Sequence, residues 1–211
     1  MKKVTVVKHP LIQDKLTMMR DIKTQSKDFR ALLKELATLM VFEVTRNLKV
    51  KNVNVKTPLN IKAKGVKIDQ SGIVLVPILR AGIGMVDGVL DVLPRARVGH
   101  IGMYREPDTL EAVEYYHKLP ESIGQSRLVL LIDPMLATGH TMVETLDTCQ
   151  REGAKNMKVM CLVASPEGIE EVRKHHPRVE IFTAAVDERL DEHGYILPGL
   201  GDAGDRIFGT K

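Results

Sequence analysis

Apolar residues along the chain follow two different periods, and the changes between them predict the order of helices and strands. From Ser26 to Asn47 they recur at the spacing of a long amphipathic helix, with Ser26 in the position of an N-cap residue. From Gly72 onward, uninterrupted apolar runs alternate with helical stretches. Such runs are typical of parallel strands covered by helices on both faces, so the pattern predicts an α/β fold with a parallel sheet.

The alternation assigns each segment after residue 70. We expect strands at 72–79, 96–103, 127–132, 157–164 and 179–186, and helices at 84–93, 141–152 and 166–175. Between Arg46 and Lys67 there are seven basic residues and no acid, with a partial alternation that predicts an exposed β-hairpin. The glycine-rich stretch from Gly194 to Gly209 predicts a folded loop and not a regular helix. No repeat or linker interrupts the chain, so we expect residues 1–211 to form a single domain.

Composition narrows the class of protein. No apolar stretch reaches the roughly 20 residues that span a bilayer, which predicts a cytoplasmic protein with no membrane contact. Cys149 and Cys161 lack metal-site spacing and stand among apolar neighbours, which predicts reduced, buried thiols. The net charge of +4 suits anionic ligands. The absence of tryptophan and an aromatic content of 4% argue against a stacking platform for nucleic acid.

The turn "DPMLATGHT" follows the predicted strand 127–132 and precedes a helix. Its small residues allow the backbone to approach an anion, and its amides point toward the start of that helix. Thr138 and Thr141 add hydroxyl donors, whereas Asp133 is better suited to ribose hydroxyls than to phosphate. The residues suggest a sugar phosphate, and an ordinary strand-to-helix connection stays open as the alternative.

The same turn resembles the phosphoribosyl diphosphate (PRPP) loop of type I phosphoribosyltransferases, in the variant of the uracil phosphoribosyltransferase family. Three further stretches agree with that family, and so does the start "HPLIQDKLTMMRD": they are "PILRAG" at 77–82, "MYRE" at 103–106 and "GYILPGLGDAGDRIFGT" at 194–210. The resemblance covers essentially the whole chain. His140 departs from it, since a second glycine is expected there.

The resemblance implies that uracil and PRPP give UMP and pyrophosphate, a step of pyrimidine salvage. It implies a parallel sheet flanked by helices, with an N-terminal helix, a flexible hairpin at about 105–120 and a C-terminal base-binding hood. Mg²⁺ is expected to be bound mainly through PRPP, without a protein metal site. GTP as an activator and a homo-oligomer of two or more subunits also follow from the resemblance.

Residue roles are implied in the same way, with Arg105 and Asp202 as catalytic residues. Arg80 and Arg105 are expected on the diphosphate, whose charge a forked guanidinium suits. Asp202 either accepts the proton of uracil N1 or orients the ribose and metal-bound water. Residues implied to bind PRPP are Arg80, Arg105, Asp133, Pro134, Met135, Leu136, Ala137, Thr138, Gly139, His140, Thr141 and Asp202. Those implied to bind uracil are Ile196, Gly201, Asp202 and Ala203.

Other interpretations stay open at this stage. The stretch 105–120 could be a passive surface hairpin, and Asp187, Glu188, Asp191 and Glu192 are predicted to form a solvated acidic turn. An RNA-binding regulator on the same scaffold would use the basic stretch 46–67. An enzyme for cytosine or a purine would share the phosphate loop and differ in the C-terminal tail.

Overall fold

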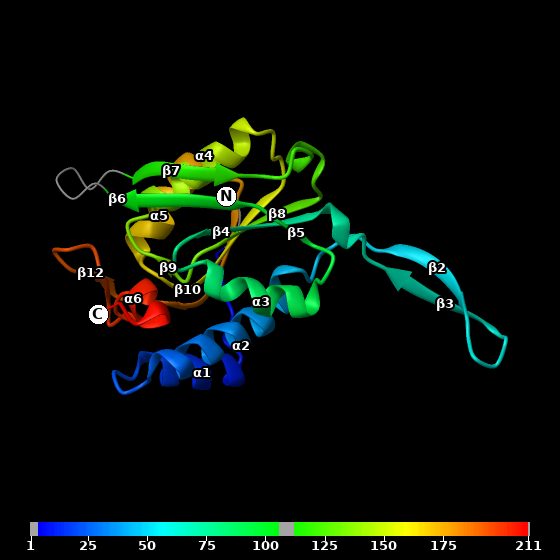
Figure 1. The fold of residues 1–211 in the computed structure, drawn as a ribbon, viewed down its shortest axis with the longest axis horizontal. Helices are drawn as coiled ribbons and strands as arrows, with labels where there is room; N and C mark the ends of the chain where they lie inside the picture. Colours follow the sequence, from blue (N-terminus) through cyan, green and yellow to red (C-terminus); the bar gives the residue numbers. More distant parts are fainter. Residues whose placement is uncertain (1–3, 106–111, 211) are drawn as a thin grey trace.

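The computed structural model describes residues 4–105 and 112–210, in which the predicted strands join a nine-stranded sheet (Figure 1). The order is β1-β11-β10-β8-β4-β6-β7, with β5 also pairing with β4 and β9 with β10. The pairing is parallel except between β6 and β7. The strands are β1 Val4–Val6, β4 Ile73–Leu79, β5 Arg97–Val98, β6 His100–Arg105, β7 Ala112–Lys118, β8 Leu128–Ile132, β9 Met135–Leu136, β10 Met157–Ala164 and β11 Glu180–Val186.

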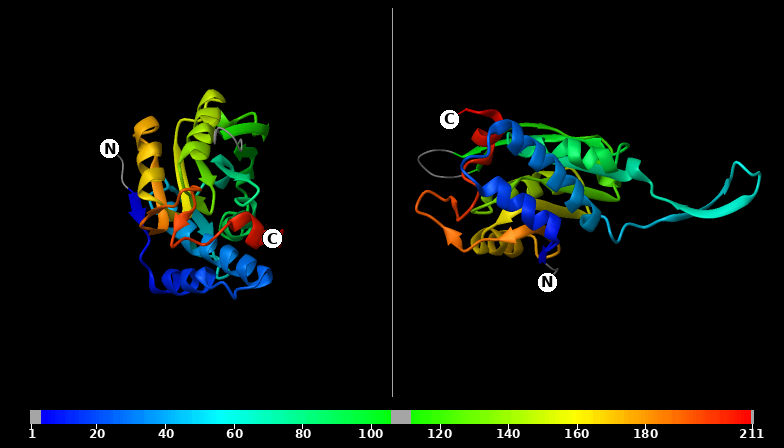
Figure 2. Two further views of the ribbon diagram at one scale, coloured as in Figure 1. Left: turned by 90° about the vertical axis from the view of Figure 1, so that its left-hand side faces the viewer. Right: turned by 90° about the horizontal axis from the view of Figure 1, so that it is seen from below.

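Two hydrophobic cores lie on the two faces of this sheet, and helices cover both faces (Figure 2). Along β4, Ile73 and Leu75 belong to one core, whereas Val74 and Val76 belong to the other, as the period of two in a strand requires. The first face is covered by α1 Pro10–Arg20, α2 Ser26–Val44, α3 Ile83–Val92 and α6 Ala203–Phe208. The second is covered by α4 His140–Arg151 and α5 Pro166–His175.

The sheet has a switch point between the neighbouring strands β4 and β8. The chain leaves β4 into α3 on one face, and it leaves β8 into α4 on the opposite face. Ligands of open α/β sheets bind in the crevice that forms outside the carboxyl ends of strands at such a point. The turn after β8, where the sequence predicts a ligand, therefore lies at this switch point.

Most predicted elements are confirmed, with shifts at their ends. The long helix begins at Ser26, and the N-cap is Gln25, so the prediction of Ser26 as the N-cap is wrong. The strand expected at 96–103 is broken at Gly99, whose amide donates to the carbonyl of Leu75 at 2.9 Å. β1 and α1 were not assigned by the apolar pattern.

Two hairpins and a short helix complete the chain. The basic hairpin is confirmed as β2 Lys51–Lys56 paired with β3 Lys62–Lys67, and it projects away from the sheet (Figure 1). The stretch after β6 also returns as an antiparallel strand, although residues 106–111 of that expected hairpin lie outside the described residues. The C-terminal tail forms β12 Arg189–Leu190, β13 Ile196–Leu197 and then α6. The prediction of a tail without regular helix is therefore wrong for its last part.

Helices α2 and α3 approach each other closely at Gly88. A Cβ atom on Gly88 would lie 2.2 Å from the carbonyl oxygen of Lys34, and the hydroxyl of Thr38 donates to the carbonyl of Gly88 at 3.0 Å. These contacts join the helix that follows β4 to the long N-terminal helix.

Gly88→Ala should force α2 and α3 apart, because the added methyl group meets backbone instead of a flexible side chain. We expect the free energy of unfolding to fall by about 1–3 kcal/mol in urea titrations. Gly65→Ala on β3 is the matched control, since its Cβ would meet nothing closer than Val53 Cγ2 at 4.0 Å. Equal stability of the two variants would contradict the close approach.

Candidate active site

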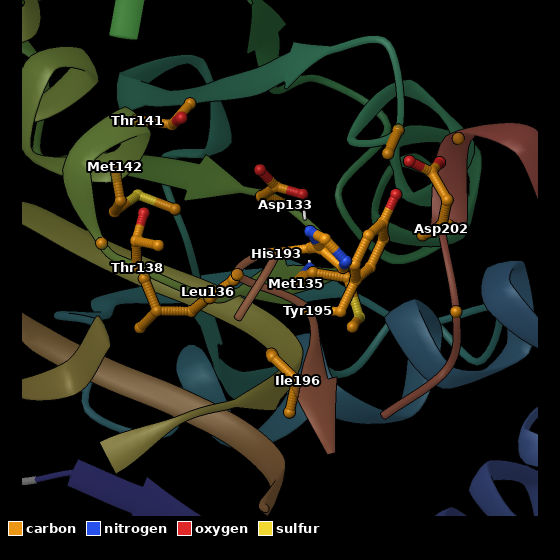
Figure 3. Close-up of a pocket in the computed structure, with 17 residues that line it drawn as sticks. Asp133, Met135, Leu136, Thr138, Thr141, Met142, His193, Tyr195, Ile196 and Asp202 are labelled. Carbon is orange, nitrogen blue, oxygen red and sulfur yellow. Dashed lines mark hydrogen bonds between the residues drawn. The ribbon is translucent and has the colours of Figure 1, made fainter. Parts of the chain in front are cut away.

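A cavity of about 360 Å³ opens beyond the carboxyl ends of β4 and β8 (Figure 3). The turn after β8 forms one part of its wall, and the C-terminal tail forms the other. Its lining residues are Ala81, Asp133, Met135, Leu136, Ala137, Thr138, Gly139, Thr141, Met142, His193, Gly194, Tyr195, Ile196, Gly201, Asp202, Ala203 and Gly204. Two segments that are more than 50 residues apart in the sequence thus share one cavity.

The end of the turn has a backbone that requires glycine. Gly139 has a φ of 87°, and a Cβ there would lie 2.8 Å from Glu171 Cβ and 2.9 Å from the carbonyl oxygen of Gly168. Helix α4 begins at the next residue, His140, which is exposed and has helical backbone. A second glycine is therefore not needed at His140 for backbone reasons.

The turn is fastened to its neighbouring strand by main-chain hydrogen bonds. The carbonyl of Pro134 accepts from the amides of Leu162 at 2.9 Å and Val163 at 3.1 Å. The two residues that follow, Met135 and Leu136, form β9 in parallel register with the end of β10. The backbone of the turn is consequently fixed before any ligand enters.

The start of α5 supports the same turn from behind. Ser165 is the N-cap of α5: its hydroxyl accepts from the amide of Gly168 at 2.8 Å and donates to the carbonyl of Ala137 at 2.6 Å. A Cβ on Gly168 would lie 2.2 Å from that carbonyl oxygen. Ser165 and Gly168 hold this turn in place. The sequence analysis missed them because their contact with the turn is tertiary.

Asp133 lies at the tip of β8 and is largely enclosed by protein. Burial raises the pKa of its carboxyl to about 7, and the negative charge of Asp202 acts in the same direction. The amide of Met135, at 3.3 Å from Asp133 Oδ1, favours the ionised form and offsets part of that effect. A carboxylate held in this way is stabilised by a cation or by hydroxyl donors.

The C-terminal tail folds over the cavity as a hood, defined here as residues 194–204. The peptide bond between Leu197 and Pro198 is cis, and Gly199 and Gly201 have φ values of 63° and 72°. Asp202 is the N-cap of α6, where its carboxylate accepts from the amide of Asp205 at 2.8 Å. The hood therefore presents both main-chain groups and one carboxylate to the cavity.

The structure brings together most of the predicted site residues. All four residues expected at uracil line the cavity, and so do seven of the turn from Asp133 to Thr141. Pro134 and His140 are not among the lining residues. Arg80 lies beside the cavity: its side chain is exposed, and Nη2 is 3.3 Å from Asp205 Oδ1. Arg105 is the last residue of β6, and its side chain lies outside the described part of the structure.

The prediction of a solvated acidic turn is wrong for Asp187. Its side chain is 6% exposed and forms a bidentate ion pair with Arg20, so it is not solvated. Among the lining residues, His193 and Tyr195 were also not predicted, although Tyr195 lies within the recognised "GYILPG" stretch. No sequence spacing could have identified Arg20 as the partner of Asp187, because the two residues are 167 positions apart.

Known proteins match the chain along its full length. The family model for uracil phosphoribosyltransferase matches residues 6–210. The uracil phosphoribosyltransferase of Bacillus licheniformis is 57% identical and covers 100% of both chains, and that of Dictyoglomus thermophilum is 56% identical and covers 99% of this chain and 100% of its own.

Solved structures agree in fold. A protein from Aquifex aeolicus has a TM-score of 0.93 at 37% identity, covering 99% of each chain. The adenine phosphoribosyltransferase of Trypanosoma brucei, solved with AMP, pyrophosphate and ribose-5-phosphate, has a TM-score of 0.55 at 14% identity, covering 89% of this chain and 85% of its own. The second likeness concerns the fold alone.

Asp133→Asn should stabilise the folded protein at alkaline pH. Because burial raises the pKa of Asp133 to about 7, ionising this carboxyl costs folding free energy as the pH rises from about 4 to 7. We expect the variant to be more stable than the parent by about 1–4 kcal/mol at pH 8, with the gain vanishing near pH 4.

Urea titrations at several pH values measure this difference. Asp14→Asn, at an exposed position of α1, removes the same charge and should change stability by less than about 0.5 kcal/mol. A less stable Asp133→Asn variant at pH 8 would contradict the electrostatic interpretation of the cavity.

Proposed function

This chain belongs to the uracil phosphoribosyltransferase family, and from that membership we infer how each part of the cavity contributes to UMP formation. The enzyme transfers the phosphoribosyl group of PRPP to uracil and releases pyrophosphate. One observation carries the assignment of roles: the glycine-rich hood shares a single cavity with the turn after β8, Asp133 to Thr141, called here the phosphate-type turn. The turn then takes the phosphorylated ribose, and the hood takes the base.

We assign the 5′-phosphate of PRPP to the turn that ends in Gly139. This assignment is supported by the left-handed Gly139, by the helix that begins immediately after it, and by the hydroxyl-bearing Thr138 and Thr141 on the cavity wall. We assign the ribose hydroxyls to Asp133, the first residue of the same turn, whose carboxylate would accept from them. Hydrogen bonds to those hydroxyls would favour its ionised form.

Uracil N1 forms a bond to C1′ of PRPP and loses its proton, to Asp202 or to the departing pyrophosphate, as the bond from C1′ to the diphosphate oxygen breaks. Negative charge grows on the departing diphosphate, and we assign its neutralisation to Arg80 and Arg105. Arg80, whose side chain is 56% exposed, contacts Asp205 through Nη2 at 3.3 Å, and a single long contact of a half-exposed guanidinium costs little to release. The guanidinium is thus available to a diphosphate that enters beside it.

Asp202 is the carboxylate of the hood, and it stands between Gly201 and Ala203, which we assign to the base. Its side chain already accepts from the amide of Asp205, which fixes the carboxylate at the edge of the cavity. We propose that it orients the ribose and metal-bound water, with proton acceptance from uracil N1 as the second role. A Mg²⁺ ion fits a site of this kind, since Asp133 and Asp202 are the carboxylates that would hold it together with the phosphates of PRPP. When bound, the ion supplies charge neutralisation on the diphosphate.

We further propose a homo-oligomer, a cytoplasmic location and activation by GTP. Association is supported by exposed apolar side chains on the projecting hairpin and its turn, where Leu59 is 80% and Ile61 is 62% exposed. The location is supported by Cys149 and Cys161, which are free and buried, with thiol pKa values raised by burial to about 12. No described helix is long and apolar enough to cross a membrane. GTP activation rests on the family resemblance.

Thr141→Val should weaken PRPP binding, because it removes a hydroxyl donor from the cavity wall while keeping the shape of the side chain. We expect the free energy of PRPP binding to become about 1–3 kcal/mol less favourable, as measured by calorimetry in the absence of uracil. Thr17→Val on α1 is the control, since its hydroxyl donates to the carbonyl of Gln13 within its own helix. Unchanged PRPP affinity in Thr141→Val would remove the phosphate assignment.

The hood should select uracil over cytosine by about 10⁴-fold in kcat/KM, because main-chain groups cannot exchange donor and acceptor roles. Uracil has an N3–H donor beside an O4 acceptor, and cytosine has the reverse pattern. We assign N3–H to a carbonyl such as that of Gly201, and a uracil oxygen to an amide such as that of Ile196 or Ala203. Steady-state rates with each base at saturating PRPP measure the ratio, and a value near one would show that the hood does not read this edge.

A further inference from the structure

We propose that Arg20 and Asp187 are positioning residues that fix the hood for uracil. Neither residue lines the cavity, and both lie behind the loop that does. The inference rests on the proposed reading of uracil by the main chain of the hood. It assigns a role in substrate affinity to the end of α1, a helix that contributes no cavity residue.

The two side chains form an enclosed, bidentate ion pair. Arg20 is the last residue of α1, and Asp187 directly follows β11. Arg20 Nη1 is 2.8 Å from Asp187 Oδ2, and Nη2 is 2.6 Å from Oδ1. The side chains are 25% and 6% exposed, respectively, so solvent screens the pair only weakly.

Both partners also hold the main chain of Gly199. The amide of Gly199 donates to Asp187 Oδ2 at 2.9 Å, and its carbonyl accepts from Arg20 Nη1 at 2.7 Å. Gly199 is folded tightly onto β13, because a Cβ there would lie 2.0 Å from the carbonyl oxygen of Ile196. Its two peptide groups are therefore fixed by charge, just two residues before Gly201.

A second arginine extends the same attachment by one residue. Arg206 of α6 donates to the carbonyl of Leu200 at 3.0 Å and to that of Asp21 at 2.7 Å, and it also bonds the carbonyl of Met19. Its guanidinium carbon lies 4.4 Å from the centre of the Phe29 ring. The carbonyls of residues 199 and 200 are thus both bound by arginines that do not line the cavity, which fixes the peptide group that leads into Gly201.

The phosphate-type turn does not depend on these contacts. It is held by β10 through Pro134 and by α5 through Ser165, on the opposite side of the cavity. Loss of the Arg20–Asp187 pair should therefore displace the uracil-reading groups and leave the PRPP-binding groups in place. A misplacement of about 1 Å in a positioned group reduces function by up to about 10²-fold.

The test compares Arg20→Ala, Arg20→Lys and Asp187→Asn with the parent enzyme, with each substrate varied at saturating concentration of the other. For Arg20→Ala we expect the KM for uracil to rise about 10- to 100-fold, while the KM for PRPP changes little. Arg20→Lys retains the charge but cannot span both carboxylate oxygens and the Gly199 carbonyl, so it should restore uracil affinity in part. Asp187→Asn should resemble Arg20→Ala, and it keeps the inference testable if Arg20→Ala does not fold.

Lys158→Met is the matched control for lost stability. Lys158 is a largely buried cation at the other end of the sheet, where Nζ bonds the carbonyl of Val44 at 2.8 Å and lies 3.2 Å from Glu180. It should lower the melting temperature and leave the KM for uracil unchanged. Equal increases in both KM values, or none, in Arg20→Ala and Asp187→Asn would overturn the positioning role. If the parent enzyme itself uses cytosine as well as uracil, the main-chain reading fails instead, a result that these variants do not produce.

Discussion

The pairing of the turn after β8 with the end of β10 is the contact on which the rest of the site depends. A turn made of small residues has high conformational entropy, and it cannot present fixed amides to an anion unless other parts of the chain hold it. Here a carbonyl of Pro134 accepts two amides of β10, and β9 continues the parallel ladder for two residues. The entropy of ordering is thus offset during folding, so that the amides of the turn are in place before any ligand binds.

This preorganisation is accompanied by an unfavourable charge arrangement in the ligand-free protein. Asp133 and Asp202 line the same cavity, and burial together with that second charge raises the pKa of Asp133 to about 7. At neutral pH the carboxyl is therefore distributed between its acid and its ionised form. Hydroxyl donors and a cation both favour the ionised form, so a ligand that brought either to Asp133 would release a proton from this residue. Sites of this kind are stabilised by the ligand and not by the fold alone.

Sequence reasoning found what local pattern encodes and missed what distant contacts decide. The runs at β4, β8, β10 and β11 were identifiable because strands buried on both faces are continuously apolar. The turn was identifiable as an anion site because glycine and threonine between a strand and a helix supply amide and hydroxyl donors, whereas the residues expected at uracil followed only from the family resemblance. The burial of Asp187 was not, since the residue stands in an acidic stretch and its partner Arg20 lies on another element. The helix α6 was missed because the glycines on either side of it predicted a loop. The helix itself is too short for its apolar pattern to indicate otherwise.

The two halves of the cavity are held by separate parts of the fold, and this separation matters for the reaction. The turn is fastened to the strand β10 and to α5, which covers one face of the sheet. The hood is fastened to Asp187 after β11 and to the C-terminal end of α1, which lies on the other face. On the proposed assignment of the hood to the base and of the turn to the phosphate, a displacement of α1 would change the first without rearranging the second. Because Arg20 and Arg206 donate to backbone carbonyls of the hood, they constrain the path of its main chain. On the proposed main-chain reading of uracil, base affinity depends on the direction of these peptide groups, so the end of α1 contributes to it without lining the cavity.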